Sequence, residues 1–156
     1  MLHRILLCAA ALSLTTLAAA RKSPPWISIE SPVNPYDATT RGAALLVHAE
    51  FREGVAQLAD LTGTAEGLVN GARRSITLHF DSTSRPSVFA LRRQWPAEGT
   101  WLLRLSLRTT TAVVSLDRAG NVASARVPTE MSQGIPLPRA VPSREIDAML
   151  ADANKR

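Results

Sequence analysis

Two histidines are the residues in this sequence whose chemistry is easiest to read. By the alternation of apolar and polar residues around them, His48 and His79 each lie on the outward face of a short strand. If both strands belong to one sheet, the two imidazoles, with Glu50 or Asp81, could hold copper or zinc. A site needs three or four converging ligands, and the pattern supplies two, so two solvent-facing histidines are the plainer interpretation.

Arginine provides nearly all of the positive charge. Lys and Arg total 18 against 13 Asp and Glu, a formal net charge of +5. Arg92, Arg104 and Arg108, with Trp95 beside them, could form a basic patch that binds an acidic envelope protein or an anionic polymer. The alternative is a solvated polar face. The arginines are spread along the chain, so the sequence does not predict nucleic-acid binding.

The motifs of common enzymes and cofactor sites are missing from the sequence. It contains no cysteine cluster, since Cys8 is its single cysteine, and no G-x-S-x-G, P-loop, G-x-G-x-x-G or H-E-x-x-H motif. We therefore expect a non-catalytic protein without a cofactor.

The first 20 residues, 1–20, are typical of a cleavable secretory signal peptide. His3 and Arg4 precede an apolar stretch that ends in Ala18-Ala19-Ala20, which predicts a helical signal cut after Ala20. The alternative is an uncleaved anchor, but the stretch is shorter than the ~20 residues that span a bilayer. We expect an exported chain, periplasmic or extracellular, with no transmembrane segment once the signal is removed.

The stretch 43–127 has the period-2 pattern of strands. Trp101, Leu103, Leu105 and Leu107, for example, alternate with polar residues. With an edge strand in the leader, the pattern predicts strands near 26–30, 43–51, 58–66, 73–80, 87–95, 100–109, 112–117 and 121–127. Seven or eight short strands at this spacing favour an antiparallel β-sandwich, with a closed barrel as the alternative.

Three turn signals separate these strands. Asn70-Gly71 is typical of a two-residue hairpin. The segments 96–99 (Pro-Ala-Glu-Gly) and 117–120 (Asp-Arg-Ala-Gly) suit type I turns in two more hairpins. Trp95 and Trp101 bracket the first of these and are expected to pack across it, with Trp101 in the core.

Proline-rich segments flank the predicted sandwich. Residues 21–42 form a Pro-containing leader with the edge strand 26–30, and residues 128–156 form a Pro-rich tail. Within this tail Ser143 can cap a short helix that runs to 153. This helix either frays or docks weakly, or it binds a partner.

The 95–103 segment (WPAEGTWLL) and the 117–122 segment (DRAGNV) carry a family resemblance. Both look like hairpins of bacterial extracytoplasmic immunoglobulin-like domains, among them secreted domains similar to CopC-like and FixH-like proteins. The resemblance implies one immunoglobulin-like sandwich. CopC-like proteins bind copper through an N-terminal histidine and further His or Met ligands. The mature chain expected here starts at Arg21, and its methionines, Met131 and Met149, lie outside the strands, so no copper ligand carries over.

Together these features predict an exported, non-catalytic binding or accessory module that acts with another envelope protein. The alternative is a periplasmic copper- or zinc-binding protein that uses His48 and His79.

Overall fold

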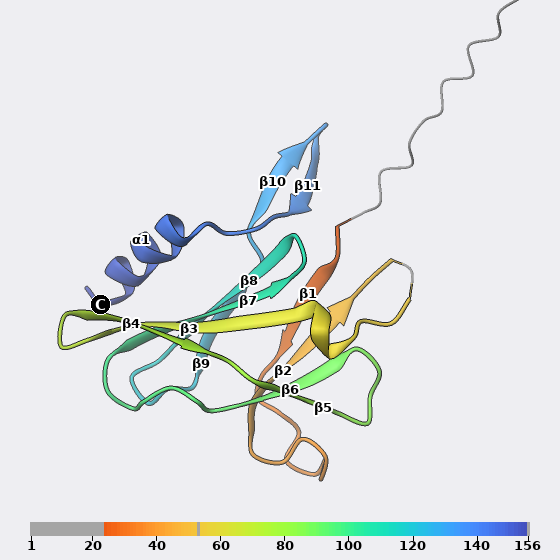
Figure 1. Cartoon of the computed structure of the whole chain (residues 1–156), viewed down its shortest axis with the longest axis horizontal. Helices are drawn as coiled ribbons and strands as arrows, with labels where there is room; N and C mark the ends of the chain where they lie inside the picture. Colours follow the sequence, from red (N-terminus) through yellow and green to blue (C-terminus); the bar gives the residue numbers. More distant parts are fainter. Residues whose placement is uncertain (1–23, 53, 156) are drawn as a thin grey trace, which may run out of the picture.

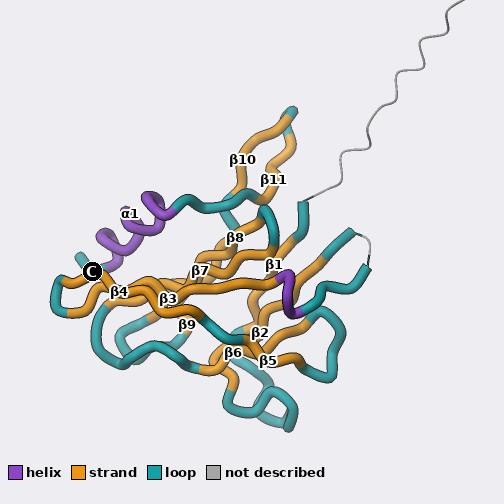
Figure 2. Tube along the Cα trace, viewed as in Figure 1, coloured by secondary structure: helices purple, strands orange, loops and turns teal. Residues whose placement is uncertain are grey.

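The computed structural model describes residues 24–52 and 54–155, which form antiparallel sheets and one short C-terminal helix (Figure 1, Figure 2). The predicted all-β class and the predicted C-terminal helix are therefore confirmed. The predicted signal helix, 1–20, lies outside the described residues.

Two sheets make up the body of the molecule. The four-stranded sheet has the order β1-β2-β6-β5, with β1 Trp26–Glu30, β2 Ala43–Glu50, β6 Val88–Arg92 and β5 Phe80–Ser82. The five-stranded sheet has the order β4-β3-β7-β8-β9, with β4 Ala72–Thr77, β3 Leu61–Val69, β7 Thr100–Leu107, β8 Thr110–Leu116 and β9 Val122–Arg126. A separate hairpin, β10 Thr129–Ser132 and β11 Ile135–Pro138, precedes the helix α1 Ser143–Ala153.

One main core joins the two sheets. Leu45 and Val47 of β2 pack in the same cluster as Leu103 and Leu105 of β7, and all four side chains are fully buried. These are the apolar positions of the alternating pattern, so the faces predicted to point inward are confirmed for both strands. Burial of these branched side chains is the main stabilising contribution to such a fold.

The outward face of each sheet is partly covered as well. Leu46 of β2 is fully buried in a small cluster with Val33 from the β1–β2 loop. On the five-stranded sheet, Val113 of β8 packs with Val141 and with Ile146 of α1. The C-terminal helix is thus docked on the sheet, and an alternation pattern alone could not indicate which outward positions it covers.

The predicted strand 73–80 is wrong, because the chain changes sheets within it. β4 pairs with β3 in the five-stranded sheet, and β5 pairs with β6 in the four-stranded sheet. Between them, the side chain of Gln94 accepts a hydrogen bond from the His79 backbone N–H at 2.9 Å and donates one to the His79 carbonyl at 2.7 Å. Gln94 therefore satisfies the backbone groups that leave both ladders at the crossing.

The predicted hairpin between Trp95 and Trp101 is also wrong. β6 and β7 belong to different sheets, so the 96–99 segment crosses from one sheet to the other. Gly99 has a φ of 95° at this crossing, and a Cβ there would come within 2.6 Å of the Leu68 carbonyl oxygen. The chain bends at 97–99, but a local turn signal does not state whether the two strands pair.

The other two turns are confirmed as hairpin turns. Asn70 and Gly71 have φ values of 51° and 76° between the paired residues Val69 and Ala72. Asp117 and Asn121 close the β8–β9 turn, with the Asp117 N–H donating to the Asn121 carbonyl at 2.8 Å. Positive φ at both central residues is the signature of the first turn type.

Hairpin β10–β11 lies in the segment predicted as a Pro-rich tail. Its strands join through Gln133 and Gly134, with φ values of 52° and 80°. Pro136 and Pro138 of β11 occupy alternate positions, which a two-stranded sheet tolerates because each strand has a free edge. The prolines led the sequence interpretation away from a strand, and the described residues contain eleven strands rather than seven or eight.

Two element starts differ from the sequence prediction. The 58–66 segment begins with a short 3₁₀ turn, Leu58–Asp60, so β3 starts at Leu61. Helix α1 begins at Ser143 with Pro142 as its N-cap, which makes no side-chain capping bond. Ser143 therefore is not the cap.

Candidate functional site

The arginines of the predicted patch are used within the fold. Arg92 on β6 pairs with Asp81 at 3.0 Å and donates to the Arg41 carbonyl at 2.8 Å. Arg108 lies in the β7–β8 turn rather than on a strand face. It pairs with Asp60 at 3.0 Å and places its guanidinium 4.4 Å from the centre of the Phe51 ring.

Arg104 lies apart from these two. It is on β7, between Thr64 of β3 and Val113 of β8, and its buried Nε has no hydrogen-bond partner among the described residues. Because Arg92 belongs to the four-stranded sheet and Arg104 to the five-stranded sheet, a single basic patch on one sheet is not formed. This corrects the predicted grouping of the site.

Trp95 and Trp101 do not form an exposed platform. Trp95 is 3% exposed, and its indole N–H donates to the Gly120 carbonyl at 3.3 Å. Trp101 is also buried, as predicted, and donates to the Glu98 carbonyl at 2.8 Å. Trp95 is thus a core residue that anchors the β8–β9 turn, and it is not available to a partner.

The two histidines do not converge. His48 pairs in register with Val88 on β6, whereas His79 precedes Phe80, whose partner on β6 is Leu91. They are separated by about 13 Å along the strands and about 10 Å across them. His48 instead contacts the Glu30 carboxylate at 2.8 Å. The described residues contain no group of three His, Cys, Asp or Glu side chains placed to hold a metal.

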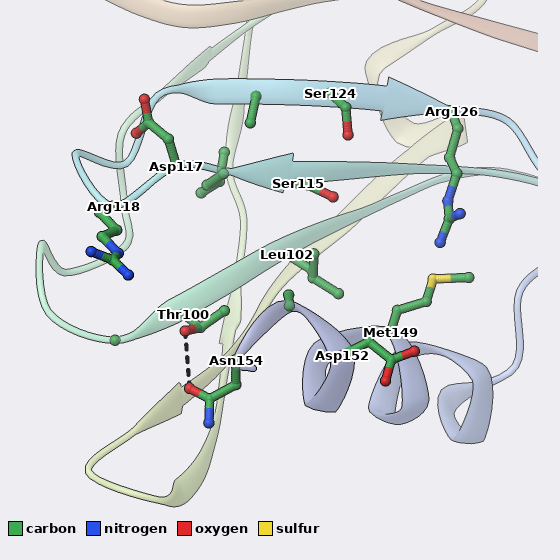
Figure 3. Close-up of a pocket in the computed structure, with 14 residues that line it drawn as sticks. Thr100, Leu102, Ser115, Asp117, Arg118, Ser124, Arg126, Met149, Asp152 and Asn154 are labelled. Carbon is green, nitrogen blue, oxygen red and sulfur yellow. Dashed lines mark hydrogen bonds between the residues drawn. The ribbon is translucent and has the colours of Figure 1, made fainter. Parts of the chain in front are cut away.

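A groove of about 900 Å³ lies between α1 and the five-stranded sheet (Figure 3). Its floor is the outward face of the five-stranded sheet, where Leu102, Ser115 and Ser124 from three neighbouring strands lie at one level. Met149 and Asp152 of α1 form the wall on one side. A hydrogen bond of 3.2 Å between Thr100 and Asn154 joins β7 to the end of the helix.

Charge in this groove is not fully compensated. Asp152 pairs with Lys155 at 3.4 Å. Asp117 accepts a hydrogen bond from the Asn121 backbone N–H at 2.8 Å, which lowers the pKa of that carboxyl below its usual range. Arg118 and Arg126 also line the groove, and the side chain of neither forms a hydrogen bond or ion pair with another described residue. Both groove cations therefore face solvent without a direct partner.

Glu145, a carboxylate near Arg126, already has a cationic partner. Arg139 binds the two oxygens of Glu145 at 2.9 and 2.8 Å, and this pairing is the main reason that the pKa of Glu145 is lowered. Arg126 acts on Glu145 only through its longer-range charge. Arg118 and Arg126 are thus the groove side chains available to an anionic group of a ligand, beside the groove carboxylates Asp117 and Asp152.

Sequence reasoning missed Arg118 and Arg126 as site residues. The signal was present in the 117–122 turn and the following strand, but these residues become part of a groove only because α1 docks on the five-stranded sheet, over β3 and β7 and against Val113 of β8. That docking joins segments far apart in the chain.

Comparisons with protein-family models, curated proteins and solved structures find no match to this chain. Within the described residues, no helix is both long enough and apolar enough to span a membrane.

Proposed function

We propose that this chain is an exported, non-catalytic binding module of the cell envelope, and that it holds a partner in the groove between α1 and the β8–β9 hairpin. The observation that carries the proposal is the groove itself. It has an apolar and hydroxyl-bearing floor and two arginines without a direct partner. Such a mixture of apolar surface with a few oriented polar groups is typical of binding sites.

The strand order supports an immunoglobulin-like sandwich as the scaffold. If β1 to β8 are read as strands A, B, C, C′, D, E, F and G, the sheets have the orders A-B-E-D and C′-C-F-G. These orders follow the immunoglobulin pattern. Sandwiches of this kind commonly serve as binding modules, which is an argument by analogy and adds to the groove rather than replacing it.

The absence of a catalytic role is proposed from the groove's own side chains. Its hydroxyls include Ser115 and Ser124, and its lining contains no histidine, lysine or cysteine. A serine nucleophile needs a neighbouring base to be activated. The lining carboxylates Asp117 and Asp152 are already engaged by the Asn121 N–H and by Lys155, so the groove is better suited to holding a ligand than to activating a serine.

Site-specific photo-crosslinking of the full chain in its native host tests this function. We expect a crosslinker at Ser124, in the groove, to give one discrete adduct, and the adduct to be lost when Arg118 and Arg126 are both changed to Glu. The matched control is the same crosslinker at Ser82, an exposed serine of β5 in the other sheet. Equal adducts at both serines, or none at Ser124, would overturn the proposal.

A further inference from the structure

The outer edge of β9 has backbone groups that pair with no other strand among the described residues. On β8, the Thr111 N–H donates to the Arg139 carbonyl and the Asp117 N–H to the Asn121 carbonyl, both on the side away from β7. Strand backbone groups alternate in direction, so Val113 and Ser115 also point toward β9 and bond with Arg126 and Ser124.

The alternation leaves two β9 residues, Val122 and Ala125, with backbone groups that point away from β8. Ala125, between Ser124 and Arg126, turns its N–H and C=O away from β8. Ala123 is the extra residue of a bulge and has no partner in the β8 register. Neither alanine makes a backbone hydrogen bond to any described segment other than β8, and both are exposed.

The other sheet edges carry features that discourage pairing. β1 is preceded by Pro24 and Pro25, β5 has only three residues, and β4 carries adjacent arginines, Arg73 and Arg74. Proline, short length and charge are the usual devices that block an edge strand. The middle of β9, Ala-Ser-Ala, contains no proline and no charge, although the strand has one bulge at Ala123 and ends in Arg126.

The two groove arginines lie at the ends of this open edge. Arg126 is level with Val113, and Arg118 follows Asp117 at the turn. Four residues of β8 separate these levels, about 14 Å along the strand. Carboxylates four residues apart on one face of an extended segment would match both cations.

Resting on the binding function proposed above, we propose that β9 binds an extended, acidic segment of a partner protein as an added strand of the five-stranded sheet. Backbone bonds to Ala125 would provide the pairing, and Arg118 and Arg126 would select acidic side chains. A peptide is favoured over an anionic polymer because the open edge offers alternating amide donors and acceptors as well as charge.

The test uses a synthetic heptapeptide, acetyl-Thr-Glu-Val-Thr-Val-Glu-Thr-amide, titrated into the chain without its signal, with the dissociation constant measured by calorimetry and NMR. We expect binding with shifts centred on β9. A peptide with lysines in place of the glutamates should bind at least about tenfold more weakly. The glutamate peptide should also bind the R118E/R126E variant at least about tenfold more weakly than it binds the unaltered chain.

A proline at the outward position tests the edge pairing. Ala125→Pro removes the outward N–H without removing a bond to β8, and we expect it to weaken binding by about tenfold or more. The matched control is Ser75→Pro. Val69 and Ala72 form the pair that closes the β3–β4 turn. Three residues after Ala72, the backbone groups of Ser75 point outward from β4, which is the edge strand on the other side of the five-stranded sheet. This control should bind the peptide like the unaltered chain.

Two N-methylated peptides test the same point without changing the protein. In an extended peptide, successive amide N–H groups point to opposite sides, so only one of the two alternating sets can face β9. Each test peptide carries N-methyl groups on one of these sets. We expect one peptide to bind and the other to fail. If both bind, the peptide lies on the groove floor and strand addition is wrong.

Two further outcomes would overturn the inference. Polygalacturonate that binds more tightly than the peptide, with no loss in Ala125→Pro, would identify an anionic polymer as the ligand. If the peptide fails to bind at 1 mM while the Ser124 adduct persists, the strand-addition proposal is wrong but the proposed binding function is still supported. Loss of the adduct would instead remove the function.

Discussion

At the scale of single residues, most charged side chains that the sequence offers for function are engaged within the fold. Arg92 and Arg108 each pair with an aspartate, and His48 contacts Glu30. Exposed pairs of this kind contribute little to stability individually. They do, however, leave fewer cationic side chains for a partner to bind. Arg118 and Arg126, which line the groove, are among the arginines that stay available.

Glu30 gives a pH-dependent prediction at this scale. Its carboxylate accepts hydrogen bonds from His48 at 2.8 Å and from Arg85 at 3.3 Å, and the His48 bond is the largest cause of its lowered pKa. A carboxyl whose pKa is lower in the folded state stabilises the fold above its ordinary pKa of 4.5. That contribution is lost as the pH falls through the folded value.

We therefore expect Glu30→Gln to lower the free energy of unfolding by less than about 1 kcal/mol at pH 7, because the pair is partly exposed. The difference from the unaltered chain should shrink below pH 4.5. Urea unfolding at pH 7, 5 and 3 measures it, with Glu50→Gln as the control on the exposed end of β2. A difference that grows toward pH 3 would contradict the assignment.

At the scale of elements, the decisive event is the docking of α1 on the five-stranded sheet. Ile146 and Leu150 are each 1% exposed, so the helix buries its apolar face. Arg73 of β4 then joins Glu66 of β3, at 2.9 Å, to Asp147 of α1, at 2.8 Å. This link fastens the helix that forms one wall of the groove.

Arg73→Ala should loosen that helix. It leaves the Glu66 carboxylate, whose side chain is 12% exposed, without its cation, and we expect a loss of about 1–3 kcal/mol in the free energy of unfolding. Faster amide hydrogen exchange in α1 would accompany it. The matched control is Arg74→Ala, since the adjacent Arg74 side chain makes no ion pair with a described residue. Equal effects of the two variants would contradict the role of Arg73.

Some of these elements could be predicted and others could not. The alternation of Leu103, Leu105 and Leu107 indicated β7 and its inward face because period 2 is a local property of a strand. The change of sheet at His79 depends on Gln94, 15 residues away. The groove depends on contact between α1 and β8. Neither distant partner is visible in a local pattern.

At the scale of the whole molecule, the proposed role in the envelope rests on the prediction that the chain is exported. Residues 1–20 lie outside the described residues, and the evidence for export is their charge, length and small residues. Cys8, the single cysteine, falls within them. Export would thus leave a chain without thiols, held together by the core between its sheets.

Mass spectrometry of the exported chain tests this. We expect the mature protein to begin at Arg21, and Ala18→Arg, at the −3 position, to block processing. The matched control is Ala19→Arg at −2, a position with no demand for a small residue. An exported chain that retains Met1 in the unaltered sequence would show that the segment acts as an anchor.

The sequence by itself determined what depends on near neighbours: the strand periods, the Asn70-Gly71 hairpin, the C-terminal helix and the proposed export signal. Only the tertiary structure decided which strands share a sheet, which arginines are already paired, and that α1 turns an outward face into a groove. The physical reason is the distance along the chain over which each effect acts. Backbone preference and side-chain period act over a few residues, whereas packing joins segments tens of residues apart.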